Sequence, residues 1–263
     1  MKQYIVDAFT DRLFAGNPAA VCLLTRWPSE TMMQNITREN NLSETAFAVP
    51  LGEDYHLRWF TPGGEIDLCG HATMACAHVI FQHLRPQRRE TRFQTRSGLL
   101  TVRRRADLYE MDFPAYELRE TAVTPEMAEA LGATPAAACL GRDLLCVFED
   151  EATVRRLTPN LEKVSRLEGL LVHATAPGHG GTDCVSRSFA PKLAVPEDPV
   201  CGSGHCHIIP YWAERLGKTT LKAEQASRRG GFLYCRSEGE RVTLGGRAVT
   251  FSVADLLIDF QGE

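Results

Sequence analysis

Two cysteine-glycine pairs stand far apart in the chain, within the related stretches DLCGHAT (67–73) and DPVCGSGH (198–205). A glycine turn that opens a helix leaves backbone N–H groups without partners, and together with the helix dipole they favour an anion. The candidates for holding a small carboxylate in this way are Gly70, Gly202 and Gly204. The alternative is that these glycines serve only the geometry of a strand-to-helix turn. The repetition favours a binding role.

Glu44 is a candidate general base. It stands between Ser43 and Thr45 in NNLSETAF (40–47), where an apolar strand begins. It is either a surface residue at the start of that strand or a carboxylate in a semi-apolar pocket. In a pocket, desolvation raises the pKa of a carboxylate and lets it abstract and return protons near neutral pH. The residues alone leave both interpretations open.

His71, Ser203 and Asp198 are further candidates, because they lie within or just before the two turns. The charged form of a histidine at a helix N-terminus is disfavoured, which suits a neutral hydrogen-bond donor or proton relay at His71. Ser203 adds a hydroxyl donor. Asp198, with Glu197, is either an ordinary loop acid or a group that orients a substrate amine or hydroxyl.

We expect no metal. The closest approach to a ligand motif is Cys201, His205, Cys206 and His207, whose spacing matches none of the usual zinc pairs. His78, His83, His173 and His179 lack such a context and are interpreted as ordinary.

The two turns belong to a longer internal repeat. RWFTPGGEIDLCG (58–70) and RSFAPKLAVPEDPVCG (187–202) share Arg-x-Phe, a proline, a loop and Cys-Gly. Downstream, TRSGLLTVR (95–103) resembles RRGGFLYCR (228–236). Three matched blocks in the same order indicate a duplication, with one copy in each of two lobes.

Hydrophobic patterning predicts short strands and few helices. A helix is expected after Ser29, with Met32, Met33 and Ile36 inward, and a short one between Thr124-Pro125 and Gly132. The expected strands are 3–9, 19–24, 45–49, 56–60, 99–104, 144–149, 170–175, 184–189, 231–236, 241–246 and 248–258. Such spacing disfavours β-α-β winding.

Each Cys-Gly pair is followed by an unusually apolar helix, over 72–84 and 204–217. Such a helix should be buried, with a sheet around it. Within the second, Pro210 predicts a kink and Gly217 a C-cap. We therefore predict an α+β fold of two pseudo-symmetric lobes, each a curved, mostly antiparallel sheet around a central helix. The lobes are expected over 1–115 and 116–247, joined by the polar connection 113–123, and the terminal segment 248–263 could return to the first.

Composition limits the possible partners. The 263 residues are 44% hydrophobic and 24% charged, as in globular proteins. A net charge of −4 argues against a nucleic-acid binder, and the basic runs RPQRRETR (85–92) and RRRA (103–106) read as solvated faces. No apolar run approaches the roughly 20 residues of a membrane helix, and no signal peptide is expected. The nine cysteines are expected as thiols of a cytoplasmic protein.

Taken together, VDAFTDRLFAGNPAAV (6–21), NNLSETAF, RWFTPGGEIDLCGHAT and EDPVCGSG resemble the phenazine-biosynthesis PhzF-like family over essentially the whole chain. The resemblance implies a diaminopimelate-epimerase-like fold with the site between two lobes, and a homodimer. It also implies a cofactor-free isomerase of a small carboxylate, the characterised family substrate being a dihydro-hydroxyanthranilate. By motif, the proton-moving glutamate is Glu44, assisted by His71, Asp198 and Ser203, while the turn glycines hold the substrate carboxylate.

The chain departs from the phenazine isomerase at both turns, where it carries the thiols of Cys69 and Cys201. That arrangement resembles two-cysteine racemases and epimerases, in which one thiolate removes an α-proton and the opposed thiol delivers another. Helix N-termini lower a thiol pKa, which would suit this chemistry. We favour the Glu44 isomerase, with Cys69 and Cys201 as substrate contacts. The two-cysteine epimerase and a non-catalytic binding protein remain as alternatives.

Overall fold

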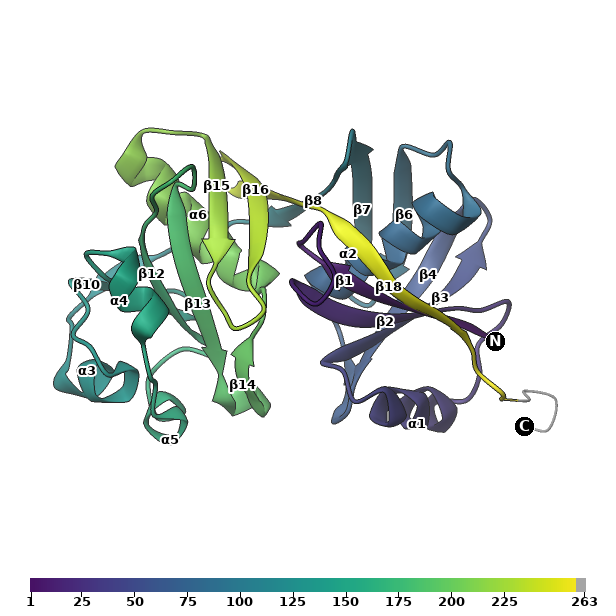
Figure 1. Ribbon diagram of the computed structural model, residues 1–263, viewed down its shortest axis with the longest axis horizontal. Coiled ribbons are helices and arrows are strands. Elements are labelled where there is room, and N and C mark those ends of the chain that lie inside the picture. Colours follow the sequence, from purple (N-terminus) through teal and green to yellow (C-terminus); the bar gives the residue numbers. More distant parts are fainter. Residues whose placement is uncertain (259–263) are drawn as a thin grey trace. The chain divides into compact units, whose positions relative to one another are not determined.

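The computed structural model describes residues 1–258, which divide into two compact units. The first unit contains Met1–Asp112 together with the chain from Gly245 onward, and the second contains Phe113–Leu244. Any structure of the terminal segment beyond residue 258 lies outside the described residues. Each unit is a mostly antiparallel sheet with a helix packed against it, as the sequence predicted (Figure 1).

In the described residues, the first unit is built from strands β1 to β8 and β18, with two α-helices and one π-helix. Its elements are β1 (Lys2–Ala8), β2 (Asn17–Leu23), α1 (Glu30–Asn40), β3 (Glu44–Leu51), β4 (Asp54–Thr61), β5 (Gly64–Ile66), α2 (Gly70–Val79), π-helix η1 (Ile80–Leu84), β6 (Glu90–Thr95), β7 (Gly98–Arg105), β8 (Leu108–Pro114) and β18 (Ala248–Asp255). In Figure 1 the yellow β18 runs beside the purple β1, with which it pairs in antiparallel register.

The second unit is built from the remaining strands and four α-helices. Its elements are β9 (Arg119–Thr121), α3 (Pro125–Leu131), β10 (Ala137–Leu140), β11 (Leu144–Val147), α4 (Glu151–Arg156), α5 (Leu161–Val164), β12 (Val172–Pro177), β13 (Cys184–Ala190), 3-10 helix η2 (Pro191–Leu193), β14 (Val195–Asp198), α6 (Gly202–Leu216), β15 (Thr220–Gln225), β16 (Gly231–Glu238) and β17 (Arg241–Gly246). Chain 113–123, expected as a connection, therefore includes the end of β8 and the short strand β9.

The pairing pattern of one unit repeats in the other. In the first, β1–β2, β3–β4 and β6–β7 are antiparallel, while β2–β3 and β4–β6 are parallel. In the second, β10–β11, β12–β13 and β15–β16 are antiparallel, while β11–β12 and β13–β15 are parallel. The same sequence of directions twice is what a duplicated unit produces.

Local signals explain where the outer helices begin and end. The Ser29 hydroxyl accepts a hydrogen bond from Met32 N and caps α1, as expected. Met33 and Ile36 are buried on the inward face of α1, whereas Met32 is only partly buried. Helix α3 begins with Pro125 and ends at Gly132, whose φ of 82° is left-handed.

The two inner helices occupy the positions that their apolar sequences predicted. Every residue of α2 from His71 to Val79 is buried, and α2 contacts β1, β2, β3 and β18. Its continuation over residues 80–84 is a π-helix rather than the expected α-helix. Helix α6 packs on β15 and β16, includes Pro210 within its span, and is capped by Gly217 with a left-handed φ of 62°.

Candidate active site

In the first unit, Glu44, Cys69 and His71 come together. Glu44 opens β3, and Cys69 is the N-cap of α2 with His71 in the first turn of that helix. The Oε2 atom of Glu44 lies 3.1 Å from His71 Nε2, and the Cys69 sulfur lies 3.5 Å from His71 Nδ1. The side chains of Glu44 and His71 are only 15% and 8% exposed. A carboxylate and an imidazole thus form a close pair in a largely dry environment.

Two further polar groups lie close to the His71 ring. The Asn17 amide nitrogen is 3.2 Å from His71 Nδ1, and the Ser43 hydroxyl is 3.4 Å from His71 Nε2. Because Asn17 begins β2 and Ser43 directly precedes β3, parallel pairing of these strands brings both to the start of α2.

The protonation states of this pair differ from those expected from the sequence. Burial alone raises the pKa of Glu44, but the charge and hydrogen bond of His71 and the hydroxyl of Ser43 outweigh it, so the pKa lies below its usual value. Burial lowers the pKa of His71, yet Cys69 and Glu44 raise it well above its usual value. We expected a raised pKa at Glu44 and a neutral imidazole at His71. The structure instead favours a carboxylate paired with an imidazolium.

In the second unit, Cys201 is the N-cap of α6 and its sulfur accepts a hydrogen bond from Gly204 N at 3.3 Å. The Ser203 hydroxyl lies 3.5 Å from the same sulfur. Gly204 has a packing role as well, because a Cβ there would lie 2.6 Å from His173 Cε1. A Cβ at Gly202 would come no closer than 3.8 Å to Leu244 Cδ1, so packing does not require glycine there.

Asp198 forms hydrogen bonds next to the same turn. Its carboxylate accepts a hydrogen bond from Val200 N at 3.2 Å, and its carbonyl accepts one from Gln225 Nε2 at 2.6 Å. The Gln225 side-chain oxygen in turn accepts from Cys201 N at 2.8 Å. Asp198 therefore helps to fix the backbone that leads into Cys201.

Neither thiol has the lowered pKa that helix N-termini were expected to give. Burial and the negative charge of Glu44 raise the pKa of Cys69. Burial and Asp198 raise the pKa of Cys201 well above its usual value, although Ser203 and the Gly204 amide oppose this. Desolvation outweighs the hydrogen bonds that favour the thiolate at each position, so the pKa of both thiols lies above its usual value.

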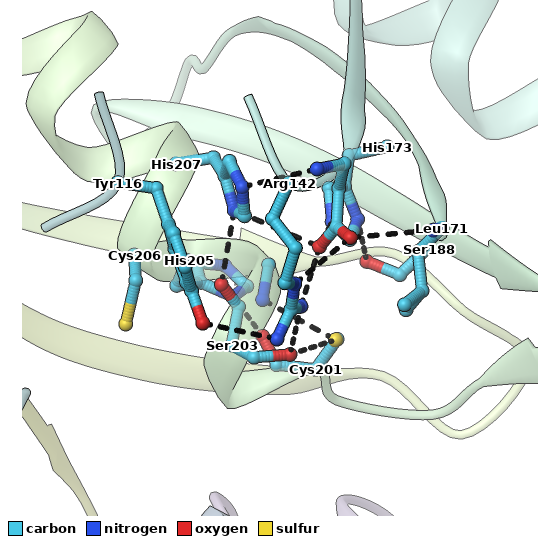
Figure 2. A network of polar contacts seen from close by, with 12 residues as sticks. Tyr116, Arg142, Leu171, His173, Ser188, Cys201, Ser203, His205, Cys206 and His207 are labelled. Carbon is cyan, nitrogen blue, oxygen red and sulfur yellow. Dashed lines mark hydrogen bonds and ion pairs between the residues drawn. The ribbon is translucent and has the colours of Figure 1, made fainter. Parts of the chain in front are cut away.

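A buried polar network lies beside Ser203, and Figure 2 shows its side chains gathered around Arg142. Arg142 and Asp143 precede β11 and form a two-pronged ion pair with N–O distances of 2.6 and 3.0 Å. His173 Nε2 lies 2.9 Å from Asp143 Oδ2, and His207 Nε2 accepts a hydrogen bond from Asp143 N at 3.3 Å. His173, interpreted from the sequence as ordinary, is thus fully buried at the centre of this network.

The sequence did not single out Arg142 or Asp143. The available signal was a charged pair placed directly before the apolar strand LLCV (144–147), where a fully buried acid requires partners.

Two groups of side chains have the donor atoms of metal ligands within 4.8 Å of one another among residues 1–258: Glu44, Cys69 and His71, and Asp143, His173 and His207. Within each group, the residues are joined by the hydrogen bonds and ion pairs given above. In the cluster that had invited a zinc interpretation, the rings of His205 and His207 contact the carbonyls of Cys201 and Ser203.

The twice-repeated, mostly antiparallel unit with a buried inner helix belongs to the epimerase-like fold class, as its structural neighbours show. A family model described as phenazine biosynthesis-like protein matches residues 6–254, and the chain belongs to that family. An uncharacterized isomerase of Pseudomonas aeruginosa is 48% identical over 93% of this chain and 94% of its own.

Solved structures agree. The crystal structure of a PhzF-family protein of Enterococcus faecalis is 48% identical, with a TM-score of 0.96 over 98% of this chain and 99% of its own. A probable proline racemase of Agrobacterium radiobacter, 12% identical with a TM-score of 0.64 over 99% of this chain and 94% of its own, shares the fold alone. Family and neighbours support an isomerase- or epimerase-type function. No helix in the described part of the chain is long and apolar enough to cross a membrane.

Proposed function

We propose that this protein is a cofactor-independent isomerase that moves a proton between two carbons of a small carboxylate substrate, with Glu44 as the general acid and base. The observation that carries the proposal is the Glu44–His71 pair, in which a mostly buried carboxylate lies 3.1 Å from an imidazole nitrogen. A carboxylate that keeps limited exposure can reach a substrate carbon while bulk water is largely excluded.

The proton transfer uses one group twice. The Glu44 carboxylate removes a proton from a carbon adjacent to a conjugated system, and the electron pair of the broken C–H bond enters that system. The resulting carboxylic acid returns the proton to a different carbon, so substrate and product are isomers. The positive charge of His71 keeps Glu44 ionised and so able to accept the proton, although it makes the carboxylate a weaker base than burial alone would. Ser203 and the turn glycines are proposed to bind the substrate carboxylate, and Asp198 to hold that turn in shape.

A two-cysteine epimerase is the second candidate, since Cys69 and Cys201 each stand as the N-cap of an inner helix. The raised pKa of both thiols disfavours it, because the thiolate is the reactive form.

The test is proton exchange in deuterium oxide, read by NMR at carbon, with cyclic diene carboxylates and amino acids as substrates. Glu44→Gln should reduce exchange by about 10²- to 10⁴-fold, the usual contribution of a general acid-base group. Cys69→Ser and Cys201→Ser should keep most of the activity. Glu53→Gln, at a surface glutamate of the same unit whose side chain is 88% exposed, is the matched control.

The opposite result would favour the epimerase, namely loss of exchange in the two cysteine variants and retention in Glu44→Gln. If the unmodified protein catalyses no exchange with any of these carboxylates, the non-catalytic alternative gains and the isomerase proposal fails.

A further inference from the structure

Arg142 links the buried network of the second unit to the start of α6. One terminal nitrogen, Nη2, donates to Ser203 Oγ at 3.0 Å and to Asp143 Oδ2 at 2.6 Å. The other, Nη1, donates to the Tyr116 hydroxyl at 3.1 Å, and the guanidinium lies 4.8 Å from the centre of the Tyr116 ring. In Figure 2 the arginine extends from beside His173 and His207 toward Ser203 and Cys201.

The network beneath Arg142 holds it in place. The Asp143 side chain is fully buried and accepts from Arg142, His173 and the backbone N–H of Leu171. The His207 ring stacks on Tyr116 at 4.3 Å with an interplanar angle of 12°. The paired hydrogen bonds to Asp143 and the ring of Tyr116 fix the plane of the guanidinium, and with it the position of Nη2.

This contact determines what the Ser203 hydroxyl can do. A guanidinium only donates hydrogen bonds, so Ser203 Oγ must accept from Arg142. The hydroxyl hydrogen therefore points away from the arginine and is free to donate, with the Cys201 sulfur 3.5 Å away as its neighbour. The Arg142 side chain is 31% exposed, so its positive charge is accessible from solvent.

The internal duplication shows that this cation is a specific feature of the second unit. Ser203 stands two residues after Cys201, as His71 stands two residues after Cys69. Each of these side chains follows a Cys-Gly pair and contacts the sulfur of the preceding cysteine.

The partners of the two equivalent side chains have opposite charge. Glu44 directly precedes the residue of β3 that pairs with Phe60, and in the second unit the residue before the partner of Phe189 is the apolar Leu171. The second unit thus lacks an acid at the position of Glu44, and the group on its Ser203 is a guanidinium instead. The first copy carries the proton-transfer pair, whereas the second carries a cation and a hydroxyl donor.

We propose that Arg142 is a positioning residue that orients the Ser203 hydroxyl as a hydrogen-bond donor to an anionic group of the substrate, and adds its positive charge to that binding position. The inference rests on the proposed function in that the ligand is a small carboxylate. It extends that proposal by assigning the recognition of the anionic group to a pair, Arg142 and Ser203, that acts as one unit.

A double-mutant cycle tests the proposal. Binding of 2-aminobenzoate and benzoate, two stable aromatic carboxylates, is measured by calorimetry for the unmodified protein, Arg142→Gln, Ser203→Ala and the double variant. Each single variant should bind about 10- to 100-fold more weakly, the effect of losing one charge-assisted hydrogen bond. The double variant should be little weaker than Arg142→Gln, because both changes remove the same interaction. Arg142→Lys, which keeps the charge, should recover part of the affinity.

Arg155→Gln is the matched control, because Arg155 makes a similar two-pronged pair with Glu224, at 2.8 and 2.9 Å, at the surface of the same unit. Circular dichroism melting shows which variants are folded. If Arg142→Gln does not fold, the comparison of Ser203→Ala with Arg142→Lys supplies the test.

Independent, additive losses from Arg142→Gln and Ser203→Ala would overturn the proposal, as would unchanged affinity in folded Ser203→Ala. Failure of the unmodified protein to bind either carboxylate would overturn it as well. Failure of the proposed function looks different, because exchange would then persist in Glu44→Gln while the coupling between Arg142 and Ser203 remained. For any substrate that the exchange experiment finds, Arg142→Lys should raise KM more than it lowers kcat.

Discussion

At the scale of single residues, Glu44 and His71 each stabilise the charged form of the other, which shifts their pKa values in opposite directions. The lowered pKa of Glu44 adds stability above its unfolded-state pKa, and this is lost as pH falls through the folded value. The raised pKa of His71 adds stability below its unfolded-state pKa, and this is lost as pH rises through the folded value. The ion pair therefore stabilises the protein in the window between the lowered Glu44 and raised His71 pKa values.

Replacing His71 should reverse the shift at Glu44. In His71→Gln the opposing charge is gone while the burial remains, so the pKa of the Glu44 carboxyl should rise above its usual value. The carbon-13 chemical shift of that carboxyl, followed by NMR through a pH titration, measures the change directly. Asn17→Ala, which removes a contact to His71 but no charge, should leave the Glu44 titration nearer its original position. If the pKa of the Glu44 carboxyl were the same in His71→Gln as in the unmodified protein, the charge of His71 would not be what lowers it.

At the scale of elements, the start of α6 is set by close packing as well as by polar contacts. Gly204 accommodates the His173 ring, which itself binds Ser188 and Asp143 on either side. A side chain on Gly204 would therefore displace the imidazole that supports Asp143, and through it Arg142.

Gly204→Ala should lower the free energy of unfolding by about 1–3 kcal/mol, the usual cost of overpacking, because its Cβ would lie 2.6 Å from the His173 ring. Gly202→Ala, two residues earlier, is the matched comparison, because a Cβ there would come no closer than 3.8 Å to Leu244 Cδ1. It should be neutral or stabilising by up to about 1 kcal/mol, since alanine favours a helix over glycine. Chemical denaturation of both variants measures the difference. Equal stabilities would mean that the His173 ring moves aside at no cost.

At the scale of the whole molecule, the chain consists of two similar units, which differ in the parts of the chain that supply their strands. The second unit is a continuous segment, Phe113–Leu244, whereas the first needs residues from both parts of the chain. Strand β1 lies between β2 and β18, with antiparallel pairing on both sides. Without β18, the backbone groups on one edge of β1 would lose their hydrogen bonds.

A fragment of residues 113–244 should therefore fold alone, while a fragment of residues 1–112 should not. Joining 1–112 to 245–263 through a short glycine-serine linker should restore folding, because it returns β18 to β1. Dispersed amide NMR spectra and cooperative thermal unfolding would report folding in each case. A cooperative transition in the 1–112 fragment alone would contradict the argument from β18.

Much of the fold could be predicted from the chain alone, because its signals are local. Ser29 and Gly132 mark helix ends through their own hydrogen bonding and backbone conformation, and the apolar run at 72–79 predicts burial whatever surrounds it. The repeated Cys-Gly motifs likewise indicated two similar sheets around inner helices. Strand β6 (Glu90–Thr95) was not expected, because Phe93 is the one apolar residue on its buried side and the strand begins inside the basic run 85–92.

The candidate site likewise contains residues that local sequence indicates and residues that only the tertiary structure brings together. The repeated motifs pointed to the two glycine turns, and the resemblance to the PhzF-like family pointed to Glu44 and His71, since these features lie in contiguous sequence. The sign of each pKa shift was decided only by tertiary structure, because burial and the nearest charge act in opposition and their balance depends on distances between strands. Arg142 and Asp143 were found only in three dimensions for the same reason: what gives them meaning is contact with Ser203 and His173, which are distant in the chain and adjacent only once the sheet has formed.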